Sequence, residues 1–142
     1  MWRRVLARSV LMSKNNQTAV QLALTPAPEL LPVVKTFVDR LAEQMSFEES
    51  QRVSLKQGVQ QVCRRIMEKP ASLRGQELRM EVCGFPDRME IVLEVKGQAR
   101  ETAEADTALL NQLLDRVLFE EAEDGLMRIT LVKYHSQKRS QS

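Results

Sequence analysis

The sequence predicts an α+β domain built as a two-layer sandwich, with a mostly antiparallel sheet covered on one face by three helices. Four segments alternate apolar and polar residues with the period of two that a half-buried strand requires. Three other segments repeat apolar residues at helical spacing. The predicted order is β-α-α-β-β-α-β, and half-apolar strands are typical of an antiparallel sheet with one covered face.

The first strand is predicted over residues 19–24, where apolar side chains fall on alternate positions. Residues 25–28 read Thr-Pro-Ala-Pro and end the strand, because proline cannot continue a ladder and suits the start of a helix. The first helix follows over residues 30–45, in which apolar side chains recur three and four positions apart.

A second helix is predicted up to Pro70, which ends it. Ser46 and Glu49 have the spacing of a capping box, so the helix is expected to begin there. Within residues 55–69 the apolar positions form one helical face. These positions are Leu55, Val59, Val62, Cys63 and Ile66. We expect Val59, Cys63 and Ile66 to face the sheet.

Two strands over residues 78–82 and 89–95 are expected to form an antiparallel hairpin, because the turn-forming stretch 84–87 joins them. Residues 97–107 are polar and weakly patterned, which indicates a loop.

A third helix is predicted over residues 108–117, and a last strand over residues 127–131.

The 142 residues suffice for one domain, which we place at residues 18–135. Residues 1–17 are interpreted as a disordered basic leader and residues 136–142 as a polar tail. The first eleven residues allow three interpretations: an organelle-targeting peptide, a membrane-surface anchor, or a stretch preceding the true start at Met12. Arginines interrupt the apolar run too often for a secretory signal. We favour the third interpretation, because residues 12–17 fit a disordered polar leader.

Charge argues against a polyanionic partner. The formal net charge is +2, but both chain ends are basic and residues 15–134 carry 15 Lys and Arg against 19 Asp and Glu. Nucleic acid is therefore not an expected main partner. No apolar run approaches the ~18 residues of a membrane span, so we expect no membrane partner either.

Cys63 and Cys83 are the only cysteines, and neither has a His or a second Cys at metal-ligand spacing. We interpret them as buried reduced thiols of a cytoplasmic protein. His135 is the only histidine and is assigned to a polar tail, which argues against catalytic triads and histidine metal sites.

The stretch 55–69 resembles the second helix of the anti-sigma-factor serine kinases, whose ATPase domain is shared with histidine kinases. The hairpin over residues 77–95 is similar to the central strands of that family. Residues 113–117, Leu-Leu-Asp-Arg-Val, resemble its Leu-x-Asp-x-Val, and residues 130–134 resemble its final strand. The resemblance covers residues 18–134 and implies the histidine-kinase-like ATPase fold.

The resemblance also implies that the catalytic residues are replaced. The family's general-base Glu falls at Gln61 and its Mg²⁺-binding Asn at Arg65, on a helical face that also carries Gly58. Gln61 cannot accept the proton that a general base must take. Arg65 has no acceptor atom and is a permanent cation, so it would repel the metal.

The remaining positions of the nucleotide pocket are replaced as well. The family's adenine-binding Asp falls at Val95, and the glycines of its Asp-x-Gly-x-Gly box fall at Gly97 and Ala99. The lid glycines align with Glu104 and Asp106, two carboxylates that would repel a triphosphate. The resemblance therefore implies a vestigial pocket, with no catalytic residue, no metal and no cofactor.

Simpler structural interpretations stand beside this one. Arg64 and Arg65 fit a solvated helix end, where cations complement the helix dipole. Glu101, Glu104 and Asp106 fit a solvent-exposed loop with a helix-capping acid.

Three functions are compatible with these observations. The first is a regulatory protein-binding module, a pseudokinase-like homodimer that binds a sigma factor or an anti-sigma antagonist without ATP. The second is a divergent serine/threonine kinase or ATPase that uses ATP with Mg²⁺, with the variant that Arg65 holds a nucleotide or other anion without metal. The third is an unrelated α+β interaction domain.

Overall fold

The structure, a computed structural model, describes residues 5–11, 18–24, 27–67, 77–96, 106–121 and 125–135. Its strands are β1 (Val5–Leu11), β2 (Thr18–Leu24), β3 (Leu78–Gly84), β4 (Arg88–Lys96), β5 (Arg116–Glu121) and β6 (Leu126–Tyr134). Its helices are α1 (Leu31–Gln44), α2 (Glu49–Met67) and α4 (Thr107–Leu113), and a 3-10 turn (Pro28–Leu30) precedes α1.

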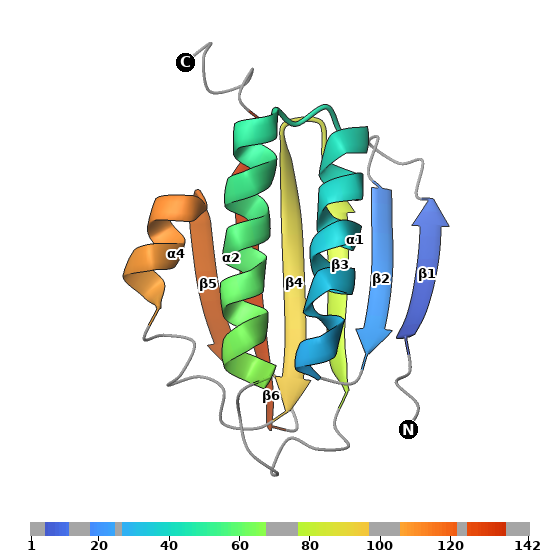
Figure 1. The fold of residues 1–142 in the computed structure, drawn as a ribbon, viewed down its shortest axis with the longest axis vertical. Coiled ribbons are helices and arrows are strands. Elements are labelled where there is room, and N and C mark those ends of the chain that lie inside the picture. The colour runs from blue at the N-terminus through green and yellow to red at the C-terminus, as the bar shows by residue number, and fades with distance from the viewer. Residues whose placement is uncertain are drawn as a thin grey trace.

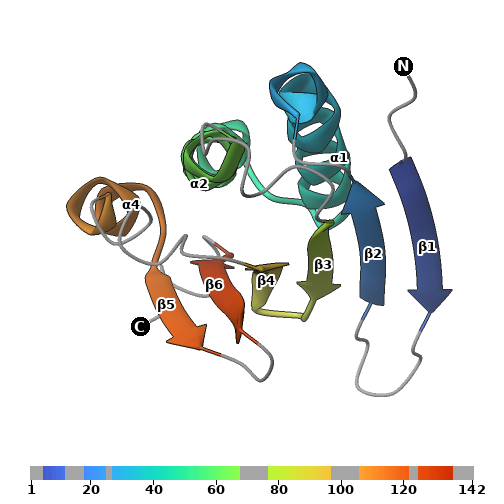
Figure 2. The ribbon, with the colours of Figure 1, turned by 90° about the horizontal axis from the view of Figure 1, so that it is seen from below.

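The six strands form one sheet in the order β1-β2-β3-β4-β6-β5, and every neighbouring pair is antiparallel. Figures 1 and 2 show α1, α2 and α4 side by side on one face of this sheet. No described element covers the other face (Figure 2). The predicted α+β class, the antiparallel sheet and the layer of three helices are therefore confirmed.

The core lies between the helices and the sheet. Val59, Cys63 and Ile66 are all at most 1% exposed, which confirms the predicted inner face of α2. Burial raises the pKa of the Cys63 thiol to about 12, because the apolar surroundings disfavour the thiolate. Cys83 is also buried, and neither cysteine forms a disulfide, as predicted.

The predicted leader differs from the structure in part. Val5–Leu11 form β1, which pairs with Thr18–Leu24 along its whole length. The expectation that residues 1–17 lie outside the fold is therefore wrong for these seven residues. A basic residue does not prevent an edge strand, because the outer positions of a sheet tolerate charge. Residues 12–17 and the expected tail, 136–142, lie outside the described residues.

The third helix is shorter than predicted, and a strand was missed. α4 ends at Leu113, and β5 begins at Arg116 inside the range 108–117 that was assigned to the helix. Asp115 fixes the change of direction, because its amide donates to the Val132 carbonyl at 2.9 Å and its carboxylate accepts from the Tyr134 amide at 2.7 Å.

The capping box is also placed differently. Ser46 has a φ of 65° and lies in the turn after α1, so it does not cap α2. α2 begins at Glu49, and the amide of Glu48 donates to the side-chain oxygen of Gln51 at 3.4 Å. That contact is the second half of a capping box, shifted by two residues from the predicted position.

His135 belongs to the folded unit rather than to a tail. One of its ring nitrogens lies 2.9 Å from the Ser46 carbonyl oxygen, and its ring packs edge-on against Phe47 with centroids 5.1 Å apart. Among the described residues, no helix is long and apolar enough to cross a membrane.

Candidate functional site

The outer face of α2 that carries Gly58, Gln61 and Arg65 is directed towards α4. These residues are three and four positions apart, so their Cα atoms lie on one side of the helix. The residue that precedes α4 is Asp106, and its carboxylate lies against Gln61 and Arg65. Three of the seven predicted pocket positions thus come together in one cluster, which we call the Asp106 cluster (Gln61, Arg65 and Asp106).

The geometry of this cluster is that of a fork-to-fork ion pair with an added amide. Arg65 Nε donates to Asp106 Oδ2 at 2.7 Å, and Arg65 Nη2 donates to Asp106 Oδ1 at 3.1 Å. Gln61 Nε2 donates to Asp106 Oδ2 at 3.1 Å. Two parallel charge-assisted bonds fix the guanidinium and carboxylate in one plane, and such pairs are among the stronger hydrogen bonds in proteins.

The Asp106 side chain is 10% exposed, whereas that of Arg65 is 38% exposed. The hydrogen bond from Arg65 is the largest influence on the Asp106 carboxyl and lowers its pKa below the ordinary value. Burial opposes this shift, while the Gln61 hydrogen bond and the charge of Arg65 add to it. The carboxylate is therefore held ionised, facing the cation that it pairs with.

Both simpler interpretations require correction at this point. Asp106 is the residue before α4, but its side chain makes no capping hydrogen bond, and it is buried rather than solvent-exposed. Arg64 is exposed, as a solvated helix end predicts, whereas Arg65 is engaged by Asp106. The carboxylate is directed to α2 because the guanidinium offers two charged donors, which a helix N-terminus does not.

Gly58 lies one turn before Gln61, and its lack of a side chain lets α4 approach α2 closely enough to form the cluster. A Cβ atom at Gly58 would lie 2.9 Å from Leu114 Cδ1, closer than carbon atoms pack. Leu114, directly after α4, is 3% exposed and belongs to the core. The missing side chain at Gly58 thus lets α4 and the following residue settle against α2.

The other predicted pocket positions do not join the cluster. Val95 is fully buried in β4 as part of the core. Gly97, Ala99 and Glu104 lie outside the described residues. Within the described ranges, no group of three or more His, Cys, Asp or Glu residues is arranged to hold a metal ion.

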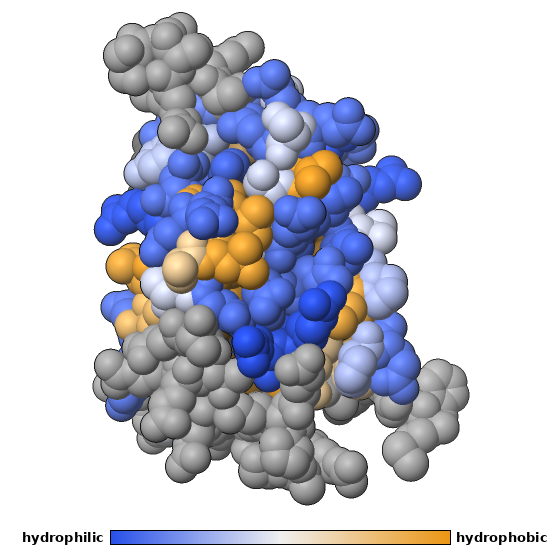
Figure 3. Space-filling view, turned by 60° about the vertical axis from the view of Figure 1, so that its left-hand side comes forward, coloured by the Kyte–Doolittle hydropathy of each residue, from blue (hydrophilic) through white to orange (hydrophobic). Residues whose placement is uncertain are grey.

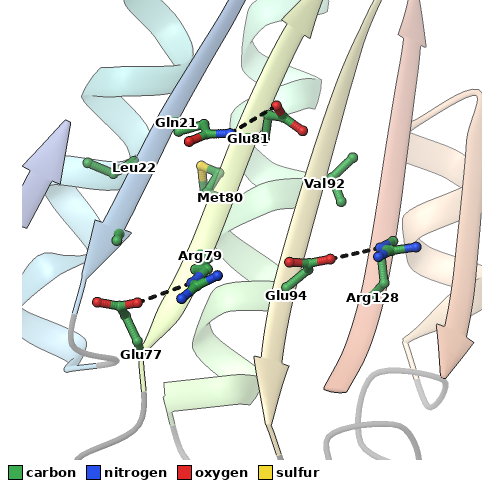
Figure 4. Close-up of a pocket in the computed structure, with 10 residues that line it drawn as sticks. Gln21, Leu22, Glu77, Arg79, Met80, Glu81, Val92, Glu94 and Arg128 are labelled. Carbon is green, nitrogen blue, oxygen red and sulfur yellow. Dashed lines mark hydrogen bonds and ion pairs between the residues drawn. The ribbon is translucent and has the colours of Figure 1, made fainter. Parts of the chain in front are cut away.

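A second polar region lies on the uncovered face of the sheet, and the sequence argument did not identify it. An open depression of about 810 Å³ lies there, lined by residues of β2, β3, β4 and β6. Figure 4 shows the side chains that line it. Glu94 accepts from Arg128 at 2.9 Å, Glu81 from Gln21 at 3.3 Å, and Glu77 from Arg79 at 3.2 Å. The charged residues at alternate positions of these strands are the sequence signal that could have indicated this polar face.

Chemically, the Asp106 cluster joins α2 to the start of α4, and its carboxylate is engaged by both other members. Gln61 is a neutral amide, and Arg65 cannot lose its proton. Two of the three guanidinium nitrogens, Nε and Nη2, already donate to Asp106. An external anion that used this edge of the guanidinium would have to displace the carboxylate.

No protein-family model matches this chain, and no curated protein matches it either.

Proposed function

We propose that this protein is a regulatory protein-binding module, resembling an anti-sigma-factor serine kinase that has lost ATP binding and catalysis. Its scaffold would be the histidine-kinase-like ATPase fold. A homodimer would bind a regulatory protein in the cytoplasm, either a sigma factor or an anti-sigma antagonist, and would not phosphorylate it.

The observation that carries this proposal is the ion pair of Arg65 with Asp106. By the resemblance, Arg65 stands at the metal-binding position and Asp106 at a lid glycine. The resemblance therefore assigns the two partners of the ion pair to opposite sides of the nucleotide phosphates. A carboxylate in that place competes with phosphate for the same guanidinium and also repels it.

Binding of a partner requires none of the lost groups. Protein contacts use helices, strand edges and exposed side chains, and the described chain offers an uncovered sheet face for them (Figure 2). Without a nucleotide to distinguish two states, capture of the partner would follow concentration and affinity alone.

The second candidate is a site that binds ATP or another anion at Arg65. The exposure of Arg65 favours this candidate. Its side chain is 38% exposed, so the guanidinium could exchange the Asp106 carboxylate for another anion. In this candidate Asp106 is a displaceable internal anion, and Mg²⁺ is not needed.

The first test is calorimetric titration with ATP, with and without Mg²⁺. Wild-type protein and the variant Arg65→Ala are compared, with Lys56→Ala as a control that removes a cation elsewhere on α2. We expect no binding at sub-millimolar ATP in any of the three. A micromolar dissociation constant that depends on Mg²⁺ would overturn the proposed loss of ATP binding. A weaker signal that is independent of metal and lost only in Arg65→Ala would establish the anion site.

The second test addresses the partner. Proteins are captured from native extract with and without ATP and Mg²⁺, and radiolabelled phosphate is then supplied. Equal capture in both conditions without transfer of label is expected. Label transferred to a bound protein would overturn the proposal.

A further inference from the structure

Strand β5 ends the sheet, and its outer edge faces no other described strand. Its residues Arg116, Leu118 and Glu120 are exposed, and Leu118 keeps 41% of its surface accessible. Figure 3 brings this flank of the molecule forward and shows apolar patches within a mostly hydrophilic surface. A free strand edge beside an exposed leucine is an unusual surface for a monomer, because unpaired backbone groups recruit another strand.

The sequence of β5 is complementary to itself in one antiparallel register. When a two-fold axis normal to the sheet relates two copies, the uncovered faces of both sheets point the same way. An even-numbered residue of one β5 strand must then lie opposite an even-numbered residue of the other, and an odd-numbered residue opposite an odd-numbered one. With the axis at Leu118, Leu118 meets Leu118, Arg116 meets Glu120, and Glu120 meets Arg116. On the inner face, Val117 meets Phe119. An axis at Val117 or Phe119 does not pair Arg116 with Glu120.

We propose that two copies of this protein pair through their β5 edges, antiparallel and centred on Leu118, so that the two sheets become one. Each copy contributes the same surface, as a two-fold interface requires. The central leucines cover one another, and two Arg–Glu contacts flank them symmetrically. Opposite charges at directly facing positions stabilise a strand pair, whereas like charges destabilise it.

The charge pattern of the uncovered sheet face extends to this edge. Successive cross-strand neighbours on β3, β4, β6 and β5 alternate in sign: Arg79, Glu94, Arg128 and Glu120. Arg116 of the second copy would continue the alternation beyond Glu120. The register that pairs the leucines is thus the one that extends the existing row.

The opposite edge of the sheet lacks this property. Strand β1 is also terminal in the sheet. Its full antiparallel self-pairing would be centred on Arg8, the middle residue of Val5–Leu11. Arg8 would then occupy facing positions in this register, and like charges at facing positions disfavour a strand pair. The self-complementary edge is therefore β5.

This inference rests on the proposed function only for the expectation of a homodimer, and it does not depend on the absence of nucleotide. The experiment measures molar mass by sedimentation at micromolar concentrations, without ATP. Wild type, Arg116→Glu, Glu120→Arg and the double charge swap are compared. Circular dichroism and thermal melts check that each variant is folded, and both substituted side chains are exposed.

The wild type should reach twice the 16.3 kDa of one chain. Each single reversal should raise the dissociation constant about tenfold or more, because it creates two like-charge contacts across the axis. The double swap should return within about threefold of wild type, since the symmetric pairing restores both contacts. A mixture of the two single variants should form a heterodimer that neither forms alone.

Three results would overturn the inference. The first is a wild-type protein that remains monomeric at about 100 μM, which would put the dissociation constant above the weak-binding range of about 10⁻⁴ M. The second is a pair of single variants that both dimerise as the wild type does. The third is a folded double swap that remains monomeric. The second result would move the dimer to another surface. Tight Mg-ATP binding would defeat the proposed function and leave this outcome unchanged.

Discussion

The two ends of helix α2 are joined to the rest of the molecule by one buried polar side chain each, and the two contacts differ in charge. At the N-terminal end, Gln51 is 9% exposed and donates to the Tyr134 carbonyl at 2.8 Å. At the other end, the buried Asp106 accepts hydrogen bonds from Arg65 and Gln61. Among the described residues these are the two buried polar side chains.

The difference shows what each contact is for. Gln51 joins α2 to the end of β6, and a neutral amide satisfies such a contact at every pH. Asp106 joins α2 to the short helix α4 through an ion pair that an external anion or acid can weaken. One end of α2 is thus fixed, while the other end depends on a charge.

Removing the apolar part of the α4 contact should have the largest effect. Leu114→Ala deletes a 3% exposed side chain beside Gly58 and leaves a cavity. We expect a loss of about 3 kcal/mol in the free energy of unfolding, measured by urea titration. Leu109→Ala is the matched control, because Leu109 lies on α4 and is 41% exposed. An equal loss in both variants would show that α4 does not depend on the Gly58 contact.

The charged contact should come next. Asp106→Ala removes three hydrogen bonds and should cost about 2 kcal/mol. The cost stays moderate because Arg65 is partly exposed and can bind water instead. Urea titration measures the loss. A variant as stable as wild type would mean that α4 is held by apolar packing alone.

The ion pair of Asp106 with Arg65 should make the stability of the protein fall at low pH. The folded pKa of Asp106 lies below its ordinary value of 3.8, so its contribution is complete above that value and is lost as pH falls towards the folded pKa. Wild type should therefore lose more stability than Asp106→Asn between about pH 5 and pH 2. Parallel curves for the two proteins would contradict the assigned ion pair.

The smallest loss of stability is expected at the N-terminal end of α2, where the contact is uncharged. Gln51→Ala removes the bonds to the Tyr134 carbonyl and the Glu48 amide, and should cost about 1 kcal/mol. Thermal unfolding at several pH values measures it, and the loss should not vary between pH 4 and pH 8. Gln57→Ala, an exposed residue of the same helix, is the control. A loss that grows at low pH would remove the distinction between the two ends.

The fold was predictable where a local pattern determined it. The inner face of α2 and the β3–β4 hairpin follow from apolar spacing and from the turn at residues 85–87, which are local features. The predicted helix includes the first two residues of β5, because Leu113 and Val117 are four residues apart, a spacing that also fits a helix followed by a strand. No element is predicted for the rest of β5. Its identity depends on pairing with β6, which lies further along the chain. β1 was missed for the same reason.

The candidate site was predictable in its positions but not in its contacts. Gln61 and Arg65 share a helical face by spacing alone, and the resemblance added Asp106 to the same set. No sequence pattern states that Asp106 turns from its own helix towards Arg65, since an acid before a helix ordinarily caps it. The row of charges on the open sheet face required the register of four strands.

Alkylation of the buried Cys63 thiol can measure how often α2 opens. Burial raises the pKa of this thiol to about 12 and leaves none of the side chain accessible, so the folded protein presents almost no reactive thiolate at pH 8. Alkylation in a Cys83→Ser background would therefore report only molecules in which α2 has separated from the sheet. When closing is faster than alkylation, the rate gives the opening free energy under native conditions.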